Sequence, residues 1–184
     1  MAARGVLVVM EETAHAPPES NHEVGTAATA EAFEALFRAV YPRLVGALAV
    51  ASDPEAAADA VQDAFVQANL HWGRIAYYES PAAWVRRVAV NRLSNQRRGL
   101  QRRDAAIARL AVPVAAELAP ADFDLAEAVS ALPDRQRLSI CLYYLADLAV
   151  ADVADALGVS EGTVKSNLHD ARRALAEKLG ARDG

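Results

Sequence analysis

The stretch from Leu148 to Leu179 constrains the fold more than any other part of the sequence, because it reads as two helices joined by a tight turn. Gly158 stands where a chain that leaves a helix often needs a positive φ, which glycine adopts at little cost. Ser160 follows as a good N-cap for the next helix. We therefore predict one helix that ends near Gly158 and another that begins just after Ser160.

The second of these helices has one apolar face and one polar face. Its apolar residues recur at helical spacing, at Val164, Leu168, Ala171 and Leu175. Short polar and basic side chains fill the other side, and such a helix suits the major groove of DNA. A plain helix hairpin with a solvated outer face would show the same spacing. The outward residues are predicted to be Lys165, Ser166, His169, Asp170 and Arg173.

Composition favours helices along the whole chain. Hydrophobic residues make up 53% of the 184 positions, and alanine, the strongest helix former, supplies much of that share. No segment shows the sustained alternation of apolar and polar residues that is typical of strands. We predict an all-α fold of two small helical domains.

Positive charge is concentrated in the middle of a chain whose net charge is −5. Residues 81–109 hold eight arginines and one acid, Asp104, whereas the segments on both sides are acidic. This distribution indicates a focused contact with a polyanion rather than coating of DNA by bulk charge. A solvated arginine-rich helix would have the same composition.

Proline and glycine mark the predicted boundaries of the first domain. Residues 1–28 lack periodicity and are predicted to be a disordered extension. The helical pattern begins near Thr29, and Pro42 is expected to kink this run or to restart it. The first domain is thus predicted to cover residues 29–98.

A flexible linker is predicted between the two domains. Residues 99–121 lose the periodic pattern and are punctuated by glycine and proline. The pattern returns in a second domain at residues 122–180. In this domain one apolar face is expected to be buried, formed by Leu138, Cys141, Leu142 and Leu145.

The segment from Pro54 to about Trp72 reads as a helix whose start is capped by Asp53. One face is apolar and is expected to be buried. The opposite face combines acidic, amide and apolar side chains, which suits docking on another protein and equally suits solvent. Its outward residues are Asp59, Gln62, Asp63 and Val66.

An aromatic stretch precedes the basic helix, which is predicted to start at Pro81 with Ser80 as its cap. Clustered aromatic rings can stack on unpaired bases, and nearby arginines can contact phosphates. Packing in a core or hinge would also explain the rings. The residues concerned are Trp72, Tyr77, Tyr78, Arg86, Arg87, Asn91, Arg97 and Arg98.

Taken together, these segments resemble an extracytoplasmic-function sigma factor of the bacterial sigma-70 superfamily. DPEAAADAVQDAFVQA at 53–68 and SPAAWVRRVAVNRLSNQRR at 80–98 resemble sigma region 2. LPDRQRLSICLYY at 132–144 and DVADALGVSEGTVKSNLHDARRAL at 152–175 resemble sigma region 4. The resemblance implies a subunit that binds core RNA polymerase, recognises the minus-35 and minus-10 promoter elements and promotes DNA melting.

The resemblance also assigns a partner to each predicted surface. The helix at 53–68 would dock on the clamp helices of the polymerase β′ subunit, and the β flap would be a second contact. The aromatic stretch and basic helix would capture flipped bases of the minus-10 element. An anti-sigma factor is a further expected partner. The minus-35 element would be read by Ser160, Thr163, Lys165, Ser166, Asn167, His169, Asp170 and Arg173.

Two positions depart from the pattern of many relatives, which carry arginine where this chain has Asn167 and Asp170. The loss of two positive charges should weaken the attraction to phosphates. Asp170 could instead accept a hydrogen bond from N4 of cytosine.

Other functions find less support in the sequence. A free-standing helix-turn-helix regulator would leave the helix at 53–68 and the basic helix without a task. A helical enzyme would need a catalytic cluster, but the four histidines are scattered and Cys141 is the only cysteine. We therefore predict no catalysis, no cofactor, no metal and no small-molecule substrate.

No apolar run approaches the roughly 20 residues of a membrane helix. The segment 6–10 is too short for the core of a signal peptide, and acidic residues follow it. A cytoplasmic protein without membrane insertion is predicted.

Overall fold

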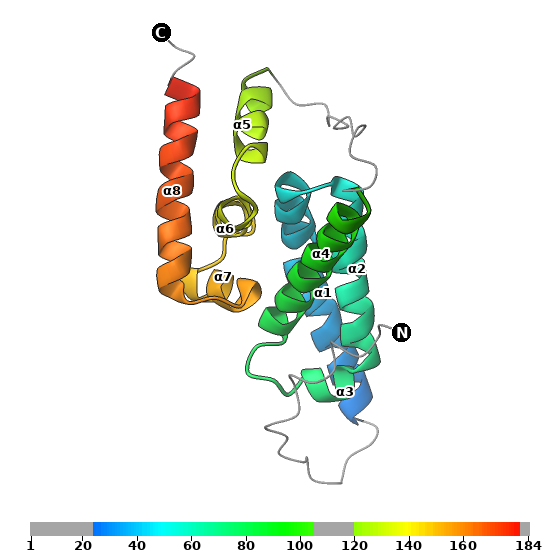
Figure 1. Cartoon of the computed structure of the whole chain (residues 1–184). Coiled ribbons are helices and arrows are strands. Elements are labelled where there is room, and N and C mark those ends of the chain that lie inside the picture. Colours follow the sequence, from blue (N-terminus) through cyan, green and yellow to red (C-terminus); the bar gives the residue numbers. More distant parts are fainter. Residues whose placement is uncertain (1–23, 105–119, 181–184) are drawn as a thin grey trace.

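The computed structural model describes residues 24–104 and 120–180, and every regular element within them is a helix (Figure 1). The prediction of an all-α fold is thereby confirmed. Four helices precede the gap and four follow it. They are α1 (Val24–Ala51), α2 (Pro54–Leu70), α3 (Trp72–Ile75), α4 (Pro81–Asp104), α5 (Pro120–Ser130), α6 (Asp134–Tyr144), α7 (Val150–Leu157) and α8 (Glu161–Gly180).

Helix α1 is longer and less interrupted than predicted. It begins at Val24 rather than near Thr29, and it continues through Pro42, so the predicted restart there is wrong. A proline removes one backbone hydrogen bond from a helix. In the turns that follow Pro42, the side chains of Leu44 and Leu48 are fully buried. Their packing stabilises the helix despite the missing hydrogen bond.

The predicted linker also differs at its start. Helix α4 continues to Asp104, so the chain stays helical beyond residue 98. Helix α5 begins at Pro120, just before the predicted end of the linker. The rest of the predicted linker, 105–119, and most of the predicted extension, 1–23, lie outside the described residues.

The first unit, α1 to α4, is built around small side chains. Helix α2 packs between α1 and α4. Large residues such as Leu48, Val61, Phe65 and Leu93 are buried there, and alanines fill the remaining contacts. Because alanine is small, the helix backbones can approach closely. The alanines with no exposed surface are Ala47, Ala51, Ala57, Ala60, Ala64, Ala68 and Ala89.

Side-chain caps fix where α2 and α4 begin, as predicted. Asp53 accepts a hydrogen bond from the backbone N–H of Ala56 at 2.8 Å, and Pro54 is the first residue of α2. The Ser80 hydroxyl accepts a hydrogen bond from the N–H of Ala83 at 3.1 Å, and α4 begins at Pro81. Each cap satisfies a donor that the first turn of a helix leaves unpaired.

The second unit, α5 to α8, encloses a core in which Leu142, Val153, Val164 and Leu168 are buried. The prediction that Leu145 is buried is wrong, because 48% of this residue is exposed. Leu145 follows Tyr144, the last residue of α6, and lies where the chain leaves this helix, at the edge of the second unit rather than in its core.

The two units pack against each other. Helix α4 contacts α7, and α1 contacts both α5 and α6. Helix α8 lies on the side of the second unit that is remote from α1 to α4 (Figure 1). The outward surface of α8 is therefore not covered by the first unit.

Candidate nucleic-acid interface

The outer face of α2 is arranged as predicted. Asp59, Gln62, Asp63 and Val66 are exposed, whereas the opposite face of the helix lies in the core. Asp63 accepts a hydrogen bond from Arg92 of α4, with 2.5 Å between oxygen and nitrogen. Asp59, Gln62 and Val66 are directed to solvent, and no ion pair of Asp59 is found among the described residues.

The same face continues beyond the predicted residues. Asn69 and Leu70 are exposed at the end of α2, and 66% of Leu70 is accessible. Leu70 stands four positions after Val66, and Asn69 seven after Gln62. Extending the helical spacing by one turn would have found both residues.

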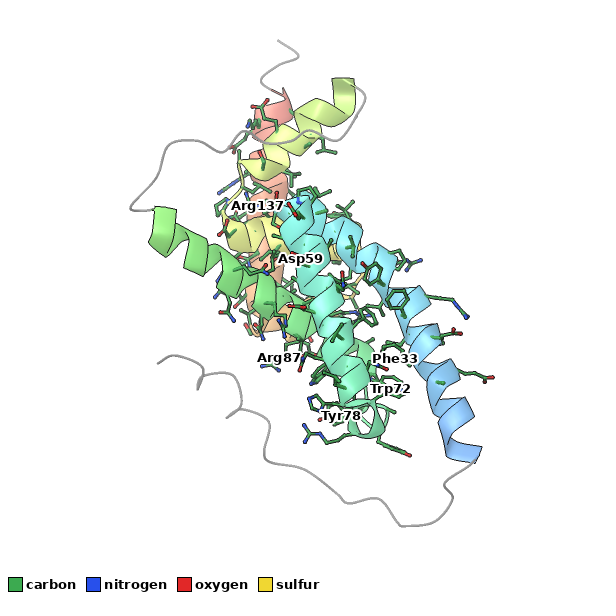
Figure 2. The ribbon with its side chains drawn as sticks, turned by 90° about the vertical axis from the view of Figure 1, so that its right-hand side faces the viewer. Phe33, Asp59, Trp72, Tyr78, Arg87 and Arg137 are labelled. Carbon is green, nitrogen blue, oxygen red and sulfur yellow. The ribbon has the colours of Figure 1, made fainter. Side chains whose placement is uncertain are left out.

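The structure separates the three aromatic residues that were predicted to act together. Trp72 packs edge-to-face on Phe33 of α1, with ring centroids 5.1 Å apart, and contacts the core (Figure 2). Tyr78 is half-buried, whereas 74% of Tyr77 is exposed. Trp72 thus contributes to packing, and Tyr77 presents its ring to solvent.

The basic helix α4 offers two exposed polar residues one turn apart, Arg87 and Asn91. Arg86 differs from them, because it donates a hydrogen bond to Asp152 of α7 at 2.9 Å and its side chain is 17% exposed. Arg97 and Arg98 continue along α4, and the prediction for their side chains lies outside what the structure describes. Arg87 and Asn91 remain accessible to a ligand.

The turn before α8 has the predicted geometry. Gly158 ends α7 with φ of 64°, in the left-handed region. The Ser160 hydroxyl accepts a hydrogen bond from the N–H of Thr163 at 3.2 Å and lies 2.9 Å from the Thr163 hydroxyl. Ser160 is therefore the predicted N-cap, and both hydroxyl groups already have a partner.

Helix α8 divides into a buried and an outward face. Val164, Leu168 and Ala171 are buried against the second unit. Asn167 lies between the faces and donates a hydrogen bond to the Ser139 hydroxyl of α6 at 3.2 Å. Asp170 is half-buried, with its carboxylate 3.9 Å from the Arg173 guanidinium. The residues exposed on the outward face are Lys165, Ser166, His169 and Arg173.

Sequence reasoning missed Arg172. Its guanidinium lies 5.7 Å from the ring centre of Tyr143 and 5.6 Å from that of Tyr144, and it donates a hydrogen bond to the Tyr144 hydroxyl at 2.9 Å. These contacts join α8 to the end of α6. No local pattern signals them, since even Tyr144, the nearer partner in sequence, is 28 positions from Arg172.

The described residues contain no cluster of histidine, cysteine and acidic side chains that could hold a metal ion. Burial raises the pKa of the Cys141 thiol to about 11, although the nearby Arg137 opposes this shift. The thiol therefore stays protonated near neutral pH and is a poor nucleophile. Within residues 24–104 and 120–180, none of the helices has the length and apolarity needed to span a membrane.

Comparison with known families matches both units. Residues 36–103 match the family described as Sigma-70 region 2, and residues 122–175 match Sigma-70, region 4. The first match covers most of α1 to α4. The second covers α6 and α7 and most of α5 and α8.

Individual proteins match over most of the chain. The ECF RNA polymerase sigma factor SigM of Mycobacterium tuberculosis is 34% identical over 152 residues, which cover 81% of this chain and 78% of SigM. SigL of the same species is 33% identical over 165 residues, covering 83% of this chain and 92% of SigL. Among solved structures, the sigma factor RpoE of Bartonella quintana, in complex with the anti-sigma factor NepR, matches with a TM-score of 0.67 and 26% identity. That match covers 82% of this chain and 98% of RpoE.

Proposed function

Because the chain belongs to the extracytoplasmic-function sigma factors of RNA polymerase, we propose a separate task for each of its three exposed helix faces. A sigma factor acts in promoter recognition and transcription initiation, and it is a non-catalytic specificity subunit of the polymerase. The outer face of α2 docks on the clamp helices of the β′ subunit. Asp59, Gln62 and Val66 make this contact, and Leu70 extends it.

The start of α4 and the loop before it act on the melted strand of the minus-10 element. Arg87 and Asn91 are exposed one turn apart, and Tyr77 offers an accessible ring for stacking on an unpaired base. A flipped base costs a few kcal/mol to extract from a duplex, so a site that captures it favours the open promoter.

The outward face of α8 reads the minus-35 element as duplex DNA. Lys165, Ser166, His169 and Arg173 are exposed there, and they lie on a helix that is anchored by its buried face. Asn167 is neutral and is hydrogen-bonded inward, and Asp170 is a half-buried acid close to Arg173. This surface therefore carries only a modest positive charge. Binding through α8 alone is therefore weak, and the polymerase brings this helix to the promoter.

The observation that carries this proposal is the exposed face of α2, where acidic and amide groups lie beside Val66 and Leu70. A free-standing DNA-binding regulator would have no use for this face. The β flap is proposed as a contact of the second unit. The structural similarity to RpoE of Bartonella quintana, which was solved in complex with the anti-sigma factor NepR, supports an anti-sigma factor as a further partner.

The test is size-exclusion co-elution with bacterial core RNA polymerase in the absence of DNA. The wild-type chain should form a one-to-one complex. Asp59→Ala with Gln62→Ala should weaken the complex at least about tenfold, because contacts at the centre of an interface often cost more than 1 kcal/mol each. Asp155→Ala is the control, since it removes one exposed acid from α7.

A second pair of substitutions separates docking from melting. Arg87→Ala with Asn91→Ala should leave co-elution unchanged and should reduce the permanganate reactivity of unpaired thymines in promoter complexes. Unchanged co-elution of the α2 variant would exclude this docking face. Loss of co-elution in the α4 variant would contradict the division of tasks between the two helices.

A further inference from the structure

The outward face of α8, which is turned away from the first unit (Figure 1), is shallow at its centre. At about 3.6 residues per turn, Gly162, Ser166 and Arg173 lie near the middle of this face. Among the described residues, an added Cβ at Gly162 would meet only the Ser160 hydroxyl, at 3.8 Å, so packing does not require a glycine there. A glycine and a serine at this place let the helix backbone approach the base edges of a DNA groove closely.

The two positions that depart from the pattern of many relatives lie on different parts of α8. Asn167 is turned roughly 110° away from the centre of the outward face. It lies on the flank that meets α6, where it donates its hydrogen bond to Ser139. Asp170 is turned away by only roughly 50°, and 39% of its side chain is exposed. Position 170 therefore faces a bound DNA groove, whereas position 167 faces the protein.

Asp170 and Arg173 form a couple of opposite charge on this face. The carboxylate lies 3.9 Å from the guanidinium, which is too far for a hydrogen bond. The two groups therefore attract each other, while the carboxylate can still accept hydrogen bonds and the guanidinium can still donate them. Glu177 lies on the other side of Arg173, with 4.0 Å between carboxylate and guanidinium, and 74% of its side chain is exposed.

The couple matches the edge of one kind of base pair. In the major groove a C·G pair presents the N4 donor of cytosine beside the O6 and N7 acceptors of guanine. N4 and O6 are about 3 Å apart, because they are hydrogen-bonded to each other. Asp170 and Arg173 present the complementary pattern, an acceptor beside donors, at a similar separation. An arginine at position 170 would present donors only and would favour guanine.

We propose that the couple of Asp170 and Arg173 selects a C·G pair in the minus-35 element. Asp170 accepts a hydrogen bond from N4 of the cytosine, and Arg173 donates to the guanine of the same pair. This inference rests on the proposed function of α8. The carboxylate repels phosphates, so it adds selectivity for a base rather than affinity for DNA in general. A chain with arginine at position 170 would select the same pair in the reverse sense, with guanine in place of cytosine.

Selection from a randomised pool tests the assignment. Holoenzyme is assembled from core polymerase and the full chain, and the promoter-length duplexes that it retains are sequenced. Wild-type holoenzyme should select cytosine at one position of the minus-35 motif. Asp170→Arg should select guanine at this position. Asp170→Asn should select adenine, because an asparagine amide pairs with N6 and N7 of adenine.

Glu177→Gln is the matched control. It removes one negative charge beside the same arginine, as Asp170→Asn does, so any general gain in attraction to phosphates is shared by both variants. The motif selected by Glu177→Gln should be that of the wild type. Identical motifs for the wild type and every Asp170 variant would overturn the proposal. A change at many positions, or an equal change in Glu177→Gln, would overturn it as well.

A competition assay measures the discrimination itself. Two duplexes differ only by exchange of C·G for G·C at the selected position. Wild-type holoenzyme should prefer the C·G duplex about five- to 150-fold, the usual cost of one mismatched pair. Asp170→Asn should abolish this preference, Arg173→Gln should reduce it, and Asp170→Arg should reverse it. A full wild-type preference in Asp170→Asn or in Arg173→Gln would overturn the role of the couple.

Failure of this inference can be told apart from failure of the proposed function. A wild-type chain that does not assemble with core polymerase would refute the proposed function and this inference with it. A holoenzyme that selects a minus-10 motif but no minus-35 motif would overturn this inference and leave the tasks of α2 and α4 in place.

Discussion

Two glycines near the start of α8 should respond in opposite ways to an added methyl group. Gly158 has φ of 64° and Gly162 lies within α8. A side chain at Gly158 would meet no atom within 4 Å, so Gly158→Ala carries only the left-handed backbone penalty of about 1–2 kcal/mol. Gly162→Ala should stabilise the protein by about 0.5–1 kcal/mol, because alanine is the better helix former. Urea unfolding followed by circular dichroism tests both values, and equal stability of Gly158→Ala and wild type would contradict the left-handed turn.

At the scale of elements, the short helix α3 contributes Trp72, which packs in the fold, and the loop after it contributes Tyr77, which is proposed to bind DNA. Trp72→Ala should destabilise the fold by about 2 kcal/mol, roughly half the cost of removing a fully buried aromatic ring, because Trp72 is only partly buried against Phe33. Tyr77→Ala should change stability by less than about 0.5 kcal/mol, since its ring is exposed. Tyr77→Ala should nevertheless weaken holoenzyme binding to a single-stranded minus-10 oligonucleotide, measured by fluorescence anisotropy. Unchanged binding would exclude stacking on Tyr77.

Several helix ends follow from local side-chain and backbone preferences that can be recognised in the sequence. Asp53, Ser80 and Ser160 are side-chain caps, and each helix begins where its cap predicts. Gly158 closes α7 for an equally local reason. The course of α1 through Pro42 could not be predicted this way, because burial of Leu44 and Leu48 against other helices outweighs the local preference.

At the scale of the whole molecule, the shared core should make the two units unfold together. Both tryptophans, Trp72 and Trp84, belong to the first unit, so their fluorescence reports on α1 to α4. Far-UV circular dichroism reports on the helices of both units. Because α1 and α4 pack against α5, α6 and α7, the two signals should show the same midpoint in urea. Separate midpoints would mean that the units unfold independently.

The contacts that α1 and α4 make with α5, α6 and α7 could not be predicted from the sequence. Arg86 and Asp152 are 66 positions apart, and Arg137 and Ala51 are 86 positions apart. Neither pair has a spacing that marks it as a contact, and Arg86 carries the same signal as Arg87 beside it. The candidate faces of α2 and α8 were predictable because helical periodicity separates their two sides. The pairing of Arg86 depends on tertiary packing alone.

The alanine-rich contacts between α1, α2 and α4 have a consequence for heat capacity. Unfolding raises the heat capacity in proportion to the apolar surface that becomes exposed. Alanines such as Ala57, Ala60 and Ala64 are completely buried, yet each contributes little apolar area. These contacts should therefore give the protein a smaller heat capacity change per residue, and a flatter stability curve, than a core of larger side chains would give. A sigma factor built this way should lose less stability than one with a core of larger side chains when the temperature of the cell changes.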